Sequence, residues 1–264
     1  MVAPAESLLI LAGLFLTVAA LERITSLQFA PVRFLRPHLA TDIGWYLVAT
    51  TAAIVSTVVF RPQLAKLAIP EIAPTISGLP ALARLVVAVV VYDGVSTAIH
   101  VAMHRSEALW SIHKVHHSSL QLDWLATTRA HMLENMIRQV PAQAALFALG
   151  MPAVTVATTL LVFATFALLG HSNLRLGGRA LELVFVTPHL HRLHHLPASG
   201  QRNFGTVLTL WDRLSGRLVS RHALPGERLG VPGEIDEYPQ RFAAAFRQPF
   251  QEARARRASA TQMV

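Results

Sequence analysis

Long apolar runs mark the first two thirds of the chain. Ser7 to Leu21 contains no charge, Ile43 to Phe60 is a second run of this kind, and a third begins near Leu85 and ends on His100 and His104. A membrane-spanning helix needs roughly 20 mostly apolar residues. These three runs therefore predict three membrane helices.

Two further apolar runs, Val140 to Leu149 and Ala153 to Leu169, are separated by Gly-Met-Pro. The first is short for a full crossing. We expect the pair to form a helical hairpin that enters and leaves from one face and returns His171 to the side of His100. The predicted fold is an all-α integral membrane protein with about four to five membrane-embedded helices and a cytoplasmic, histidine-rich helical cap.

Charges near the runs bear on orientation. Glu6, and no Lys or Arg, precedes the first run, which argues against a cleaved signal peptide and for a retained helix with its N-terminus outside. The next loop carries Arg23, Arg33 and Arg36, which favours the cytoplasm. The following loop carries Arg61 and Lys66, so the count of basic residues only weakly decides which of the two loops is cytoplasmic. With this topology the third run delivers its histidines to the cytoplasmic side.

The composition is that of a membrane protein. Of 264 residues, 53% are hydrophobic and 14% charged, and the formal net charge is +8. The basic residues lie beside apolar segments without interleaved aromatic residues, so anionic lipid explains them better than nucleic acid. The chain has no cysteine, which excludes disulfides and thiolate ligands. A bound metal must rest on His, Asp or Glu.

The chain is expected to form one membrane domain over residues 1–264. Within it, residues 1–84 hold the N-terminal transmembrane helices and residues 85–220 form a histidine-rich region. Residues 221–264 form an Arg-rich cytoplasmic tail with an amphipathic or interfacial character.

Nine of the thirteen histidines follow a pattern. One pair is spaced by four residues, two groups have the form His-x-x-His-His, and one stands at the end of the hairpin. Spacings of three and four place side chains on one face of a helix. The nine are His100, His104, His113, His116, His117, His171, His191, His194 and His195.

Nine imidazoles exceed the about four ligands of one tetrahedral zinc site, so two metal ions are predicted. Imidazole alone does not name the metal. A carboxylate-poor site at the mouth of an apolar bundle, in a chain without a hydrolytic nucleophile motif, suits iron that activates O2 against a lipid C–H bond. His131 and His189 are kept as candidates for a tenth ligand, whereas His38 and His222 are interpreted as loop residues.

Two carboxylates are candidates to orient a ligating imidazole. Asp93 lies two turns before His100, and Asp212 follows the last histidine group. Ligating histidines commonly donate their second N–H to a carboxylate or carbonyl. Asp93 is too far along the axis to pair with His100 on one straight helix, so we expect it to meet a histidine or arginine near His191 to His195.

The motifs from Asp93 to Gly216 resemble the fatty acid hydroxylase/sterol desaturase superfamily of membrane di-iron oxygenases. The resemblance rests on Asp-x6-His-x3-His-Arg, "LWSIHKVHHSS", Thr127 with Arg129, "GHSN", "TPHLHRLHH" and "NFG" followed by "WDRLSG". Within the superfamily these motifs are most similar to the alkylglycerol monooxygenase-like bacterial members.

This resemblance implies that the nine histidines bind two iron ions on the cytosolic face, with O2 as co-substrate and an external electron donor, either a redox protein or a reduced pterin. The expected enzyme is a bacterial inner-membrane oxygenase that hydroxylates a fatty acyl, alkyl-ether or sterol-like lipid, and Asp93 is assigned to its catalytic machinery.

Three alternatives stay open. A lipid desaturase would use the same site, and no residue separates it from a hydroxylase. A zinc-dependent membrane hydrolase needs about three protein ligands and a nearby Glu, which the excess of histidines disfavours. A metal carrier should place ionisable residues inside the spans, where Asp93 gives little support.

Overall fold

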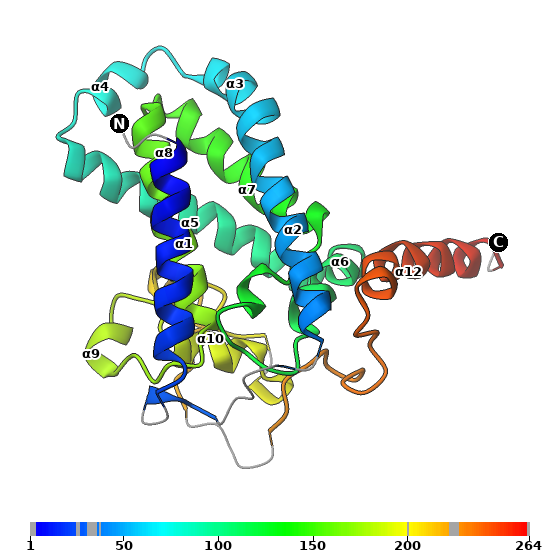
Figure 1. Cartoon of the computed structure of the whole chain (residues 1–264). Coiled ribbons are helices and arrows are strands. Elements are labelled where there is room, and N and C mark those ends of the chain that lie inside the picture. Colours follow the sequence, from blue (N-terminus) through cyan, green and yellow to red (C-terminus); the bar gives the residue numbers. More distant parts are fainter. Residues whose placement is uncertain are drawn as a thin grey trace.

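The computed structural model describes residues 4–24, 27–30, 36, 38–199, 201–221 and 227–262. Over these residues the regular secondary structure is helical, with two isolated β-bridges, Gln28–Leu174 and Phe185–Leu208, in the connecting segments. The α-helices are α1 (Pro4–Leu21), α2 (Leu39–Val55), α3 (Arg61–Leu64), α4 (Ala73–Ser77), α5 (Ala81–Arg105), α6 (Glu107–His117), α7 (Met132–Ala148), α8 (Ala153–His171), α9 (Arg179–Glu182), α10 (Pro188–His195), α11 (Leu210–Leu214) and α12 (Phe242–Gln262) (Figure 1).

Among the described residues, three helical segments are long and apolar enough to cross a membrane. They are Leu39–Leu67, Ala81–Arg105 and Ala153–His171, and a shorter apolar helix covers Leu9–Leu21. The first segment continues from α2 through a π-helical turn at Ser56–Phe60 into α3. The all-helical prediction is confirmed. The runs from Ile43 and Leu85 lie on segments of spanning length, whereas the run from Ser7 falls on the shorter apolar helix, and Ala153–His171 had been expected as an arm of the hairpin. The count of four to five membrane-embedded helices stays a prediction.

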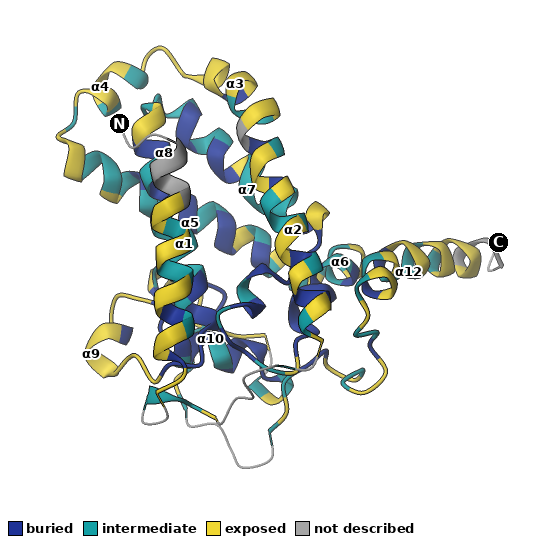
Figure 2. Ribbon diagram, in the orientation of Figure 1, coloured by how far each residue is buried: buried dark blue, intermediate teal, exposed yellow. Residues whose placement is uncertain are grey.

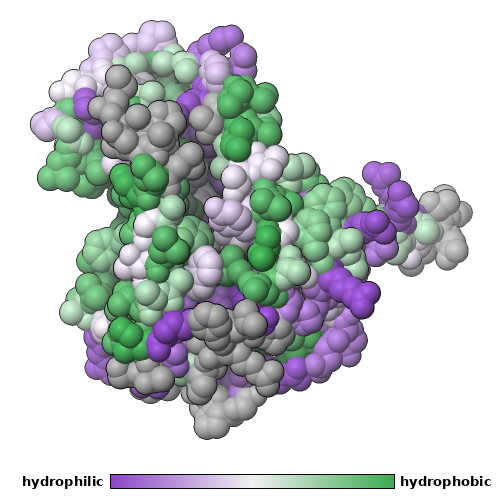
Figure 3. All heavy atoms as spheres, in the orientation of Figure 1, coloured by the Kyte–Doolittle hydropathy of each residue, from purple (hydrophilic) through white to green (hydrophobic). Residues whose placement is uncertain are grey.

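The spans carry large apolar side chains on their outer faces. Leu47 on α2 is 60% exposed, Val58 is 67% exposed and Leu82 on α5 is 75% exposed. Buried residues concentrate around α10, in the lower part of the view in Figure 2. Hydrophobic surface follows α2, whereas hydrophilic surface gathers at the lower end and toward the end of α12 (Figure 3). Lipid would cover the exposed apolar faces of the spans.

Helix α7 begins earlier than the apolar pattern indicates. It starts at Met132 rather than near Val140, and its first turns carry Glu134 and Arg138. These polar side chains face the histidine cap, so the stretch is helical without being apolar. Gly150, with φ of 72°, makes the turn into α8, which ends at His171.

The cap is held against α5 by a close approach. A Cβ on Gly94 would lie 2.6 Å from the Trp211 ring, so only glycine lets this indole reach the helix backbone. Trp211 belongs to α11, which follows the last histidine group. The contact places the segment from Phe204 to Asp212 beside α5.

Candidate metal centre

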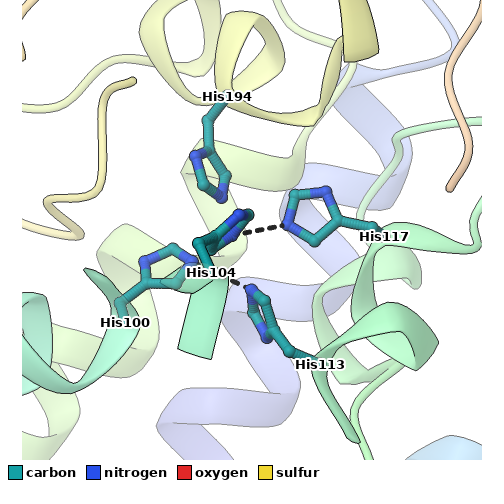
Figure 4. Close-up of side chains that lie close together, drawn as sticks. All are labelled: His100, His104, His113, His117 and His194. Carbon is teal, nitrogen blue, oxygen red and sulfur yellow. Dashed lines mark hydrogen bonds between the residues drawn. The ribbon is translucent and has the colours of Figure 1, made fainter. Parts of the chain in front are cut away.

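The structure brings all nine predicted ligands together in two adjoining clusters. We call the first, drawn in Figure 4, the five-histidine cluster: its side chains point toward one another from three helices, and its members are His100, His104, His113, His117 and His194. The second, the four-histidine cluster, consists of His116, His171, His191 and His195. Within each cluster the ligand atoms lie within 4.8 Å of one another.

Both His-x-x-His-His motifs contribute to both clusters. On α6, His113 and His117 belong to the five-histidine cluster and His116 to the other. On α10 the pair His191 and His195 belongs to the four-histidine cluster and His194 to the first. Residues i+3 and i+4 share the broad helix face of residue i but lie on either side of it, about 100° apart around the axis. Each motif therefore bridges two neighbouring sites.

The spacing of the Nε2 atoms fits metal ligands. Nε2 of His100 lies 3.0 Å from Nε2 of His113, and the His104–His117 pair is 3.2 Å apart. In the second cluster, Nε2 of His171 lies 3.1 Å from His116 and 3.0 Å from His191. Two imidazole nitrogens bound at about 2.1 Å with a right angle between the bonds lie about 3.0 Å apart.

The outer ring nitrogens fix the tautomers of several histidines. His100 Nδ1 donates to the Phe204 carbonyl at 2.8 Å, and His113 Nδ1 to Glu134 Oε1 at 2.9 Å. With both Nδ1 atoms protonated, the two neutral rings present unprotonated Nε2 lone pairs to each other across 3.0 Å. A cation between them relieves this repulsion.

The four-histidine cluster repeats the arrangement. His116 Nδ1 donates to the Arg129 carbonyl at 3.2 Å and His171 Nδ1 to the Ala167 carbonyl at 2.7 Å. In the first cluster, His194 Nδ1 donates to the Arg202 carbonyl at 2.8 Å, while its Nε2 is buried without a hydrogen-bond partner among the described residues. The donor sets thus fit one metal ion in each cluster.

Burial keeps the cap histidines neutral. It lowers the pKa of His194 to about 4. Burial, with repulsion from neighbouring imidazoles, lowers the pKa of the other cap histidines well below 6.5: His113, His116, His117, His191 and His195. Neutral imidazole is the form that binds a metal.

We expect the metal-free protein to lose stability on acidification. In the unfolded chain these histidines take up protons below about pH 6.5, whereas the folded cap excludes protons until a lower pH. The unfolded state then binds more protons, so the free energy of unfolding falls as the pH drops, by up to about 1.4 kcal/mol per pH unit for each histidine. Thermal unfolding in detergent between pH 7.5 and 5.5, run with chelator, checks this; an unchanged midpoint would contradict it.

Within the part of the chain that the structure describes, Asp93 pairs with backbone amides and with no histidine or arginine, so the expected partner was wrong. Its carboxylate accepts three backbone N–H groups, from Thr206 at 3.3 Å, Val207 at 3.0 Å and Leu208 at 3.1 Å. The reason is that the segment after the last histidine group folds across α5 and brings its own amides to the carboxylate. Asp93 therefore anchors the segment from Thr206 to Leu208, and its assignment to the catalytic machinery stays a prediction.

Asp212 holds the same segment from the other side. It accepts the N–H groups of Phe204 and Gly205, both at 2.8 Å. Since the Phe204 carbonyl accepts the Nδ1 proton of His100, the two aspartates together fix the carbonyl that orients this imidazole. Asp212 was predicted to orient an imidazole, and it acts through the backbone.

Glu134 contacts a clustered histidine, although the sequence patterns did not single it out. It is almost fully buried and accepts a hydrogen bond from His113. Burial raises its pKa, and the Arg138 guanidinium, 3.7 Å away, opposes this shift and favours the carboxylate. The sequence offered one signal for this residue: Glu134 follows His131 by three residues, in the first turn of a helix.

Replacing Glu134 by glutamine removes the negative charge behind His113 but keeps an oxygen that can accept its proton. We expect the affinity of the five-histidine cluster for divalent metal to fall about 10- to 100-fold. A chelator competition titration under anaerobic conditions measures this, with exposed Glu237→Gln as the matched control. Wild-type affinity in Glu134→Gln would show that the carboxylate is dispensable.

Neither candidate for a tenth ligand reaches a cluster. His131 is the N-cap of α7 and packs on Phe246, with ring centroids 4.8 Å apart. His189 contacts Glu182 Oε1 at 3.0 Å and the Arg221 carbonyl at 2.8 Å. His38 lies at the start of α2 in a left-handed conformation, and His222 lies outside the described residues.

A buried ion-pair network supports the four-histidine cluster. Asp42 pairs with Arg129 at 3.0 Å and with Arg36 at 3.0 Å, and Arg36 also contacts Asp123. The Arg129 carbonyl accepts the His116 proton. The first turn of α2 therefore helps to place a histidine of the cap.

A cavity of about 290 Å³ reaches the histidines from outside. Half-buried His104 and the Trp110 ring, whose centroids are 4.9 Å apart, lie on its wall. The lining is His104, Trp110, His117, His194, His195, Leu196, Pro197, Gln201 and Pro232. Small molecules can approach the five-histidine cluster through it.

Comparison with known proteins agrees with this site. The fatty acid hydroxylase family model matches residues 85–217, half of the chain, and the chain belongs to this family. The match places it among oxidoreductases and covers every member of the two histidine clusters.

One curated relative is the ornithine lipid hydroxylase OlsE of Rhizobium tropici, 32% identical over 153 residues, or 57% of this chain. The alignment spans 45% of the relative, so the chain matches less than half of its length. No solved structure matches the chain.

Proposed function

We propose that the protein is a membrane-bound di-iron oxygenase that hydroxylates a C–H bond of a lipid. One iron would rest on the five-histidine cluster and the other on the four-histidine cluster. Oxygen is the co-substrate, and the electrons come from an external donor, a redox protein or a reduced pterin.

The observation that carries the proposal is the convergence of histidine ring nitrogens at two adjoining sites. His117 and His195, from different clusters, have ring centroids only 4.5 Å apart. Metal ions bound at two adjoining clusters would be able to act on one substrate.

The overall reaction converts a C–H bond, O2, two electrons and two protons into a C–OH group and water. Bound iron would supply the oxygen chemistry. The chain holds the imidazoles neutral, orients them through carbonyls and Glu134 and, by burying the rings, keeps bulk water away from all but the cavity side.

A lipid substrate is favoured by the position of the site and by the relative. His100, His104 and His171 lie at the ends of two apolar spans, so a lipid chain lying along the bundle reaches the clusters. The relative is named for hydroxylation of ornithine lipid, and we propose a polar lipid with an alkyl chain as substrate here.

Lipid profiling tests the reaction. Cells with and without the gene are grown under isotope-labelled dioxygen, and His117→Ala serves as the matched inactive variant. We expect a lipid heavier by one labelled oxygen only in cells with the intact gene. A product lighter by two hydrogens would indicate the desaturase alternative, and an unchanged lipidome would contradict oxidation of a membrane lipid.

We also propose that the clusters face the cytoplasm of a bacterial inner membrane, where electron donors are found. Because Nε2 of His116 and His171 are 3.1 Å apart, α6 and the end of α8 share one side. Reporter fusions after Ser119, after Asn173 and at the C-terminus should all report the cytoplasm. A periplasmic signal from all three would reverse the orientation, and a split between the first two would contradict the fold.

A further inference from the structure

Helix α12 projects from the bundle across the direction of α2 (Figure 1). Its first turn packs on α2, where a Cβ on Gly44 would lie 2.8 Å from the Phe242 ring. Trp45 contacts Phe242 and Phe246, with ring centroids 4.9 and 6.1 Å apart. The helix is therefore anchored at the level of Gly44 and Trp45, in the second turn of α2.

This level is where the surface of α2 becomes apolar. Thr41 and Asp42, one turn earlier, are buried in the cap, whereas Ile43, Tyr46 and Leu47 are exposed. A tyrosine beside aliphatic side chains at the end of a span is typical of the bilayer interface. A helix lying across the spans at this level lies in the plane of the interface.

One face of α12 packs against the cap. Glu252 accepts a hydrogen bond from Lys114 at 3.1 Å, and Arg256 donates to Ser111 Oγ at 3.2 Å. Both partners belong to α6. Helix α6 therefore covers this face of α12.

The neighbouring flank combines an aromatic ring with positive charge. Phe250 is 45% exposed, and a hollow of about 270 Å³ is lined by Phe250, Ala253, Arg254 and Arg257. Exposed Arg247 lies on the same flank by helical spacing. Phe246 and Phe250 also contact His131, the N-cap of α7, with centroids 4.8 and 5.6 Å apart. The flank thus turns toward the helices of the bundle.

The opposite flank differs in composition. Its exposed residues are uncharged: Ala244, Gln251, Ala255 and Ser259. Aromatic and arginine side chains on one flank only are the pattern of helices that bind anionic membrane surfaces, since rings enter the headgroup region while guanidinium groups reach phosphates.

We infer that α12 is an interfacial helix and that its hollow at Phe250, Arg254 and Arg257 binds the phosphate headgroup of an anionic phospholipid in the bilayer. Phe250 would lie among the upper acyl carbons and the arginines at the phosphate level. This inference does not depend on the proposed reaction, because the helix contributes no histidine to either cluster.

The absence of cysteine allows single labels to be placed cleanly. Ala243→Cys, on the Phe250 flank, and Ala255→Cys, on the opposite flank, are spin-labelled in the full chain and reconstituted into bilayers. One bilayer contains phosphatidylglycerol and phosphatidylcholine, the other phosphatidylcholine alone. Collision rates with O2 and with a water-soluble nickel complex report depth.

We expect the label at position 243 to be immersed in the phosphatidylglycerol bilayer and the label at 255 to be water-exposed. The ratio of immersed to exposed label at 243 should fall about fivefold for each arginine removed in Arg254→Gln and Arg257→Gln. Arg179→Gln, on α9, is the control and should leave the ratio unchanged.

Three outcomes would overturn the inference. If both labels were exposed to water in both bilayers, α12 would not lie in the bilayer interface. If the label at position 243 were equally immersed in the two bilayers, the hollow would not require an anionic headgroup. Immersion of both labels would contradict the assignment of the flanks.

Discussion

Replacing His117 or His191 by alanine is expected to abolish lipid oxidation, with activity reduced by at least about 100-fold. His117 belongs to the five-histidine cluster, where its Nε2 lies 3.2 Å from that of His104. His191 stands centrally in the other cluster, 3.0 Å from His171 and 3.2 Å from His195. Each change removes one ligand from one site and leaves the other site complete.

Metal content should therefore fall by about half in each variant while the protein remains in the membrane. Activity and bound iron are measured on the same anaerobic preparations. His38→Asn is the control, since asparagine tolerates the left-handed conformation of that position and His38 lies outside both clusters. Equal loss of activity in the control would mean that these histidines act through general stability.

Removing the Asp93 carboxylate is expected to release the segment that follows the last histidine group. In Asp93→Ala, the N–H groups of Thr206, Val207 and Leu208 lose their acceptor in a buried place, at a cost of about 3 kcal/mol or more in total. The Phe204 carbonyl then no longer holds the His100 ring firmly. Asp93→Asn keeps one accepting oxygen and should show a smaller loss.

Hydrogen exchange of the amides from residues 204 to 208 measures this release directly, with metal retention as the second readout. Protection should fall strongly in Asp93→Ala, partly in Asp93→Asn, and not in the control Asp236→Asn, whose carboxylate is exposed and pairs with Arg228. Unchanged protection in Asp93→Ala would contradict its role as an anchor.

The apolar runs predicted the principal helices because hydropathy over about 20 residues is a strong local signal. The runs from Ile43, Leu85 and Ala153 correspond to the three segments long enough to span a membrane. The start of α7 at Met132 was missed, since its first turns carry polar side chains, buried Glu134 and half-buried Arg138, that face the histidines. Polarity in this stretch reflects the site rather than a loop.

Helical spacing selected eight of the nine clustered histidines, because their motifs repeat at three or four residues, and the expected hairpin added His171. It did not predict how the set divides, since His116 and His117 are adjacent in sequence and enter different clusters. The partner of Asp93 was unpredictable for another reason. Backbone amides carry no side-chain signature, and those of Thr206 to Leu208 are more than 110 residues away.

The central claim is that the two clusters hold two iron ions. The most direct measurement is the iron content per chain of protein purified anaerobically and reconstituted with ferrous iron, with zinc determined in the same samples. The account predicts about two irons per chain, falling to about one in His191→Ala. A wild-type value that stays near one after reconstitution, or a site that retains zinc and excludes iron, would contradict it.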